Sequence, residues 1–163
     1  MLKWKVLHVK YGHEIKVEQQ LGRFGIVNYL PKIKIIRQWS DRKKVIITPA
    51  FPGYIFINSD NTLRNKVFYA KGVLKYVRSD NKDATLENDE IEMIRIAESS
   101  ISEPQILNNH LEKGDQVEII EGPLSGYTGE LIEFMGKKRI VLFIKKIAIG
   151  FFVEIPVNHL RLI

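Results

Sequence analysis

Cysteine is absent from this chain of 163 residues. Without thiols, the chain can form neither a disulfide framework nor a thiolate metal site, and it has no cysteine nucleophile. Long hydrophobic runs are missing too, because no apolar stretch approaches the roughly 20 residues that span a bilayer. The segment from Met1 to Trp4 contains neither the apolar core nor the cleavage site of a signal peptide. Together these absences predict a cytoplasmic protein that does not enter a membrane.

Recognisable catalytic patterns are lacking as well. The four histidines, His8, His13, His110 and His159, stand apart in the sequence. No HExxH motif, no pair of carboxylates at ligand spacing and no Gly-rich phosphate loop accompanies them. The sequence therefore predicts a binding protein with no enzymatic activity, no metal and no cofactor.

Charge is distributed unevenly along the chain. Residues 1–100 contain 18 Lys or Arg and 11 Asp or Glu, a net of +7, whereas residues 101–163 contain 7 and 8, a net of −1. A polyanion would be attracted to the basic first part. A mildly basic domain can also simply be soluble, and the charge alone leaves both interpretations open.

The first part of the chain predicts a mixed α/β domain over residues 1–98, within an overall α+β fold. Val17, Leu21 and Phe24 recur at helical spacing over 14–24, and Gly25 follows as a stop signal. Other segments predict strands over 4–9, 28–39, 44–47, 54–57 and 74–77 and helices over 61–69 and 87–97. These elements favour helices packed on a mostly antiparallel sheet. Residues 99–111 lack periodicity and are expected to form a linker.

The last part, residues 112–163, predicts β-structure throughout. Strands are expected over 116–120, 129–134, 139–144, 150–155 and 160–163, and five short strands in this length indicate a small barrel. Residues 114–129 resemble the KOW motif, a strand–loop–strand that opens an SH3-like barrel. The residues that carry this resemblance are Gly114, Asp115, Val117, Gly122, Pro123, Gly126 and Gly129.

The order of signatures along the whole chain resembles the NusG family of transcription elongation factors. These signatures are Trp4 in the first strand, the run from Phe51 to Phe56 (Phe-Pro-Gly-Tyr-Ile-Phe), Lys71-Gly72-Val73, and then the KOW motif. The resemblance implies an NGN-type first domain followed by a KOW barrel. Residues 29–31 and 37–44 are similar to the specialised UpxY type, to which the RfaH branch is related. Such factors promote processive antitermination of particular operons, often for surface polysaccharide.

An aromatic patch would suit the contact with the clamp helices of RNA polymerase that the resemblance implies. Tyr54 and Phe56 are two apart in one strand and therefore face the same side. Phe68 and Tyr69 are expected to join them from the following helix. Aromatic side chains of this kind often dominate binding energy. The alternative is that Tyr54 and Phe56 fill the core of the domain.

The resemblance to RfaH-like members also implies contact with the non-template DNA strand. The matching basic positions are Lys10, Lys16, Arg23 and Lys71. They would neutralise phosphates and stack on bases. A solvated charged face is the alternative for each lysine taken singly.

In the family, the KOW domain recruits Rho or a ribosomal protein of the NusE type. The candidate contact is a loop with Ile147 and Ile149, continued by Phe151. The alternative is that these apolar residues fill the core of so small a barrel. Residues 139–155 favour strands, so we expect a barrel at rest and no fold switching. A monomer suits a factor that binds one polymerase.

A basic hairpin over residues 32–44 is the feature that the resemblance leaves unassigned. It contains six cations and one carboxylate, that of Asp41. It could contact DNA or the polymerase, or serve as a solubilising tip. Alternatives for the whole chain are a general NusG-like factor that couples polymerase to Rho or the ribosome, and a KOW-type RNA- or ribosome-binding protein. The net negative charge of residues 101–163 disfavours the last of these.

Overall fold

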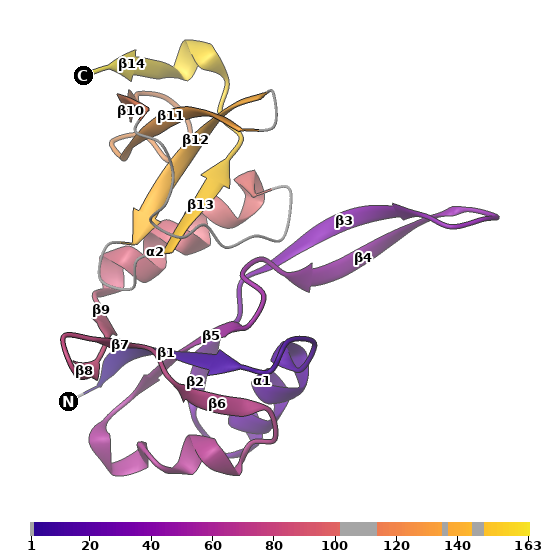
Figure 1. Cartoon of the computed structure of the whole chain (residues 1–163), viewed down its shortest axis with the longest axis vertical. Helices are drawn as coiled ribbons and strands as arrows, with labels where there is room; N and C mark the ends of the chain where they lie inside the picture. The colour runs from indigo at the N-terminus through magenta and orange to yellow at the C-terminus, as the bar shows by residue number, and fades with distance from the viewer. Residues whose placement is uncertain (1, 102–113, 135–136, 145–148) are drawn as a thin grey trace.

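Two five-stranded antiparallel sheets organise the chain (Figure 1). The computed structural model describes residues 2–101, 114–134, 137–144 and 149–163. Within these ranges, no helix has the length and the apolar character needed to cross a bilayer.

The N-terminal sheet has the strand order β2-β5-β1-β6, and β9 also pairs with β1. Its strands are β1 (Lys3–Val9), β2 (Val27–Tyr29), β5 (Tyr54–Ser59), β6 (Val73–Tyr76) and β9 (Thr85–Leu86). In the central pair, β1 lies antiparallel to β5, with Val6 opposite Phe56 and His8 opposite Tyr54. The mostly antiparallel sheet expected from the sequence is therefore confirmed.

Each face of this sheet is covered by one α-helix. Leu7, Ile55 and Ile57 point to the side of α1 (Glu14–Arg23), where Val17 and Leu21 are fully buried against them. Alternate residues of the same strands point to the other side, where α2 (Asn88–Ala97) packs. The buried residues on that side include Trp4, Val6, Phe56, Ile91 and Ile94.

The predicted helices are present except over residues 61–69. Gly25 follows α1 with a positive φ of 74°, and Glu87 caps α2 in a capping box with Glu90. Residues 61–69 instead form two 3-10 turns, η1 (Asn61–Leu63) and η2 (Lys66–Tyr69). The carboxylate of Asp60 accepts a bond from the Thr62 N–H and closes the first turn locally, so the helix predicted here was wrong in type.

The strand predicted over 28–39 is divided into two strands that join different sheets. β2 ends at Tyr29, and β3 (Lys32–Gln38) begins after Leu30 and Pro31. Pro31 has no N–H to continue a ladder. β3 pairs with β4 (Lys43–Pro49) in a two-stranded sheet that projects from the rest of the molecule (Figure 1).

A second hairpin, which we did not predict, connects β6 to β9. It consists of β7 (Arg78–Ser79) and β8 (Lys82–Asp83). Its turn residues, Asp80 and Asn81, have φ values of 52° and 63°. Asp-Asn is a pair that tolerates this left-handed backbone, so the signal was present in the sequence.

The C-terminal sheet has the order β13-β12-β11-β10-β14. Its strands are β10 (Asp115–Ile119), β11 (Thr128–Phe134), β12 (Lys137–Ile144), β13 (Ile149–Val153) and β14 (Leu160–Leu162). The five predicted strands are all observed. Within the described residues β13 does not pair with β14, so the ladder is open and the closed barrel that we expected is not confirmed.

The residues of the KOW resemblance surround the turn between β10 and β11. Gly122 and Gly126 have φ values of +90° and +95°, and Pro123 lies between them. The Gly126 N–H donates to the carbonyl oxygen of Ile119 at 2.8 Å. The remaining residues begin or line the two strands, namely Gly114, Asp115, the buried Val117 and its cross-strand partner Gly129.

The two sheets meet through aromatic and backbone contacts beside α2. The rings of Phe51 and Phe151 are 5.3 Å apart, and the Glu154 N–H donates to the Ser100 carbonyl at 2.9 Å. Buried residues of both sheets and of α2 form one continuous apolar cluster. Phe151 is fully buried there, so it is not part of the exposed loop that we predicted. Ile147 lies outside the described residues, and Ile149 is the first residue of β13.

Candidate nucleic-acid and protein interfaces

A basic hollow of about 380 Å³ lies beside α1. Its lining consists of His13, Lys16, Gln19, Gln20, Arg23 and Lys71. Three of these side chains are cationic and exposed, and none is a carboxylate. Three of the four predicted DNA-contacting residues are therefore brought together in one place.

The helix places most of these side chains. His13, Lys16, Gln20 and Arg23 follow one another at intervals of three, four and three residues, which is the spacing of one helical face. This spacing was available in the sequence, and it could have added His13 and Gln20 to the predicted set. Buried Val17 and Leu21 hold the opposite face of α1 on the sheet, so the polar face points outward.

Hydrogen bonds of the Lys71 main chain hold this residue beside α1. The Gln20 side-chain amide accepts from the Lys71 N–H at 3.0 Å and donates to the Lys71 carbonyl at 3.3 Å. Gly72 has a φ of +109°, and a Cβ added there would be 2.9 Å from the His13 Cβ. Because a larger residue would collide with the start of the helix, glycine is required for this close approach.

Lys10 lies next to the hollow but does not line it. Its side chain is exposed at the end of β1, and its N–H donates to the Gly72 carbonyl at 2.7 Å. The four predicted cations therefore occupy neighbouring segments. Among the residues that the structure describes, none of these four cations forms an ion pair. Such a group, with amide donors between the cations, is suited to binding the phosphates of a nucleic acid.

An aromatic face occupies the α2 side of the N-terminal sheet. Tyr54 is half-buried, and its ring lies 4.5 Å from the imidazole of His8. Burial, with a smaller effect of Lys75, lowers the pKa of His8 below its ordinary value and so favours the neutral imidazole. Phe56 is only 1% exposed between Tyr29 and Phe51, with ring distances of 6.2 and 6.4 Å.

The four predicted aromatic residues do not form one patch. Phe68 packs edge-on against Tyr76 at 5.9 Å, and Tyr76 belongs to the cluster on the α1 side of the sheet. Tyr69 follows on the same short turn and is 77% exposed. The expectation that both would join Tyr54 and Phe56 was wrong, because η2 is anchored through buried Val67 on the other face.

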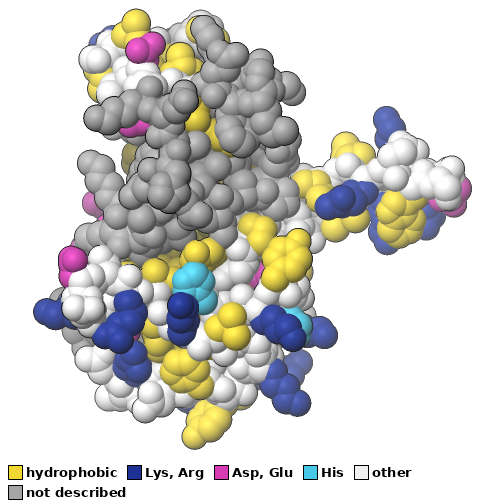
Figure 2. All heavy atoms as spheres, in the orientation of Figure 1, with side chains coloured by type: hydrophobic (Ala, Val, Ile, Leu, Met, Phe, Trp, Pro, Cys, Tyr) yellow, Lys and Arg dark blue, Asp and Glu magenta, His cyan; other side chains and the backbone are white. Residues whose placement is uncertain are grey.

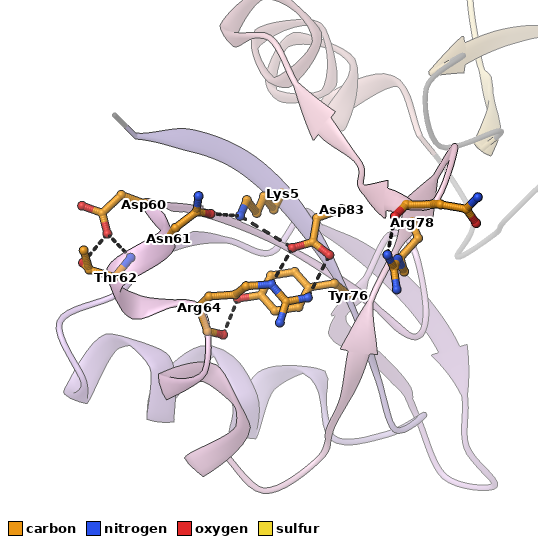
Figure 3. Close-up of polar contacts among 9 residues, drawn as sticks. Lys5, Asp60, Asn61, Thr62, Arg64, Tyr76, Arg78 and Asp83 are labelled. Atoms are coloured by element: carbon orange, nitrogen blue, oxygen red, sulfur yellow. Dashed lines mark hydrogen bonds and ion pairs between the residues drawn. The ribbon is translucent and has the colours of Figure 1, made fainter.

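A polar cluster near the start of β1 has a structural role (Figure 3). The Asp83 carboxylate accepts two bonds from the Arg64 guanidinium, at 2.8 and 3.0 Å, and lies 3.7 Å from the Lys5 Nζ. The bonds from Arg64 hold the pKa of Asp83 below its ordinary value. The Tyr76 hydroxyl donates to the Arg64 carbonyl at 2.7 Å. These contacts tie β1, β8 and the 3-10 turns together, and their charges are already paired.

Exposed cations and apolar side chains alternate over the visible surface of the N-terminal domain and along the projecting hairpin (Figure 2). The N-terminal domain thus presents three exposed features: the basic hollow, Tyr54 at the edge of a largely buried aromatic face, and the hairpin.

Comparison with known proteins assigns the chain to a family. The family described as "NusG: Transcription termination factor nusG" matches residues 2–95. The chain is 24% identical to the transcription termination/antitermination protein NusG of Thermus thermophilus, over 88% of this chain and 90% of that protein. It is 27% identical to the protein of the same name from Treponema pallidum, over 85% of each.

A solved structure supports the fold. The structure described as "Domain interaction in Thermotoga maritima NusG" superimposes with a TM-score of 0.60 at 21% identity, covering 98% of this chain and 96% of that one. At this level of identity the likeness concerns the fold alone. Because the family match covers more than half of the chain, this protein belongs to the NusG family of transcription termination factors.

Proposed function

We propose that this protein binds bacterial RNA polymerase during elongation in the cytoplasm and promotes processive antitermination, acting on specific operons of the polysaccharide type. It acts by binding and not by catalysis. The observation that carries this proposal is the basic hollow, where Lys16, Arg23 and Lys71 gather without a carboxylate on the domain that matches the family. This arrangement fits a non-template DNA strand held beside the polymerase.

Tyr54 is the residue that we propose for the polymerase clamp helices. Phe56 is buried, whereas Tyr54 is half-buried on the same face of the sheet and keeps part of its ring accessible. A partly exposed aromatic ring next to an apolar core is typical of a residue that dominates binding energy. Phe56 then belongs to the core on that face, where it packs with Tyr29 and Phe51.

The C-terminal sheet is proposed to be a KOW-type domain. Its support is the pair of positive-φ glycines at the β10–β11 turn together with the five-strand order. We propose a ribosomal protein of the NusE type, or Rho, as its partner.

The polymerase contact is tested with the purified protein and a reconstituted elongation complex. Tyr54→Ala should weaken binding by about 2 kcal/mol, which is roughly thirtyfold, and should reduce read-through of a terminator in parallel. Tyr69→Ala is the matched control, because Tyr69 is 77% exposed on the turn that Val67 anchors in the cluster on the α1 side, and it should bind like the wild type. Failure of the wild-type protein to bind at low salt would refute the proposal.

A general NusG-like factor is the alternative. The two functions are distinguished by transcription through a Rho-dependent terminator on templates with and without the recruiting element. A specialised antiterminator should increase read-through of a Rho-dependent terminator on templates that carry its recruiting element. A general factor should instead increase termination by Rho on any template. The second result would keep the polymerase contact and remove the operon-specific role.

A further inference from the structure

The hairpin β3–β4 is a separate structure with its own surface chemistry. In the described part of the chain its strands pair only with each other, through seven cross-strand pairs from Lys32–Pro49 to Gln38–Lys43. Ile33 is buried at the base, and every residue from 36 to 45 is exposed. A strand of seven residues is roughly 23 Å long. The hairpin is therefore an arm that extends beyond the domain (Figure 1).

Five cations on this arm have no acidic partner among the described residues. They are Lys34, Arg37, Arg42, Lys43 and Lys44, and all are exposed. Among the residues that the structure describes, no carboxylate oxygen lies within 4.0 Å of them. The sixth cation, Lys32 at the base, pairs with Glu18 at 2.7 Å. The outer part of the arm thus carries five cations against one carboxylate, that of Asp41, and keeps an excess of positive charge.

Two of these cations, Arg37 and Lys44, occupy a cross-strand pair of like charge. Arg37 and Lys44 are directly opposite in the register, so their side chains leave the same face of the ribbon. Like charges in directly opposite positions destabilise a strand pair. A polyanion bound to this face would remove the repulsion, whereas the free protein retains it.

The positive charge lies on both faces of the ribbon. Because side chains alternate along a strand, Lys34 and Lys43 project from the face opposite to Arg37 and Lys44. A flat protein surface would contact one face alone. The major groove of a duplex is about 12 Å wide, admits a two-stranded β-ribbon, and has phosphates along both walls.

The tip of the arm adds an aromatic ring. Trp39 is 42% exposed, with the Lys44 Nζ 4.5 Å and the Arg42 guanidinium 5.9 Å from its ring. A cation–π group of this kind presents an apolar surface and positive charge together, which suits the sugar-phosphate backbone. It also provides a reporter, because the other tryptophan, Trp4, is 6% exposed in the core.

We propose that the hairpin β3–β4 binds double-stranded DNA by lying in its major groove, with Arg37 and Lys44 on the phosphates of one wall and Lys34 and Lys43 on those of the other. This is a second nucleic-acid site, separate from the hollow beside α1. It does not depend on the polymerase contact.

The test measures binding of the full-length protein to a fluorescently labelled DNA duplex of 20 base pairs, without polymerase, over a series of salt concentrations. Arg37→Gln combined with Lys44→Gln should weaken binding at least tenfold at low salt. It should also lower the slope of log affinity against log salt by about 1.8, because two phosphate contacts are lost. In the wild type, the duplex should change the fluorescence of Trp39.

The matched control is Lys16→Gln combined with Arg23→Gln, which removes the same charge from the hollow. It should lower the affinity for single-stranded DNA more than the affinity for the duplex. The variant with Arg37→Gln and Lys44→Gln should lower the affinity for the duplex more than that for single-stranded DNA. Equal losses of duplex binding in both variants would show a response to net charge alone and would overturn the proposal.

A protein partner is the competing occupant, because Ile36, Val45 and Ile47 are also exposed on the face of Lys34 and Lys43, at 71, 59 and 54%. Ile36→Thr combined with Val45→Thr keeps the β-branched shape. Two results together would show that the arm binds protein and that the proposal is wrong. They are loss of polymerase binding in this variant and no duplex binding by the wild-type protein at 50 mM salt. Unchanged duplex affinity on loss of Arg37 and Lys44 would also overturn it.

Discussion

The cations of the N-terminal domain fall into two groups, which differ in whether a carboxylate accompanies them. Lys5 and Arg64 share Asp83 in a cluster that joins distant segments of the chain (Figure 3). The cations of the hollow and of the hairpin tip are exposed, and among the described residues none of them forms an ion pair. Paired charges here contribute to folding, whereas unpaired ones are available to a ligand. Substitutions in the two groups should therefore separate stability from binding.

The largest effect is expected at the paired group. Asp83→Asn removes the carboxylate beside the Lys5 ammonium, which is 6% exposed and keeps the neutral Asn61 side chain at 3.1 Å and the Tyr76 ring at 5.6 Å. Breaking a buried pair in this way should lower the free energy of unfolding by about 3 kcal/mol, measured by urea denaturation. Glu18→Gln is the control. Its partner Lys32 has a side chain that is 33% exposed, so the loss should stay below about 1 kcal/mol.

The same carboxylate should make stability depend on pH. Bonds from Arg64 lower the pKa of Asp83 from its ordinary value of 3.8, so the folded state binds the proton more weakly than the unfolded state. Its contribution is complete above pH 3.8 and is lost as the pH falls through the lower folded pKa. The difference in stability between the wild type and Asp83→Asn should therefore shrink in acid. A difference that stays constant from pH 7 to pH 2 would contradict this assignment.

The next largest effect on stability is expected at Gly72, where the chain passes close to the start of α1 beside the hollow. Gly72→Ala places a methyl group 2.9 Å from the His13 Cβ at a φ of +109°, which should cost about 2 kcal/mol of stability. Gly22→Ala is the matched substitution, because it lies in α1 with nothing within 4 Å of the added Cβ. It should stabilise the protein by about 0.5 kcal/mol or more. Thermal unfolding of both variants measures the contrast, and equal effects would mean that the close approach is not required.

The unpaired cations of the hollow should affect binding without affecting stability. Lys16→Ala combined with Arg23→Ala should weaken binding of a single-stranded oligonucleotide about tenfold, which is 1.4 kcal/mol, and lower its salt slope by about 1.4. Unfolding should change by no more than about 0.5 kcal/mol. Lys3→Ala combined with Lys82→Ala removes two exposed cations elsewhere on the domain and should leave both quantities nearly unchanged. An equal loss of binding in that control would mean that the hollow is not a site.

The smallest effect has the opposite sign. Arg37→Glu replaces a like-charge pair with an attractive one opposite Lys44, so it should raise stability by about 0.5 kcal/mol. Arg37→Gln removes the repulsion alone and should give a smaller gain. Denaturation in low salt measures the difference, and high salt should remove it. A loss of stability in Arg37→Glu would show that the guanidinium has a structural partner.

Local patterns in the sequence predicted the elements and part of the site. The spacing of Val17 and Leu21 predicted α1, and the same helical geometry brought Lys16 and Arg23 into one hollow. The glycines of the β10–β11 turn, Gly122 and Gly126, have the positive φ that such turns need. These features depend on residues close together in the chain, for which the sequence pattern is informative.

Features that depend on distant contacts were not predicted correctly. Phe68 and Phe56 are both aromatic, but which face of the sheet each one joins is decided by the packing of η2 through Val67. Burial of Phe151 depends on Phe51, a hundred residues earlier in the chain. The pattern of residues 28–39 predicted β-structure correctly but could not show that Pro31 divides it between two sheets.

The ring contact between Phe51 and Phe151 has a consequence for how the molecule melts. The two sheets bury their side chains in one continuous apolar cluster, so separating them exposes apolar surface on both. Units that share a core lose their structure together, because neither retains its full burial alone. Heating should therefore produce a single calorimetric transition, with an enthalpy that reports both sheets. The two halves of this chain are then expected to behave as one cooperative unit of unfolding.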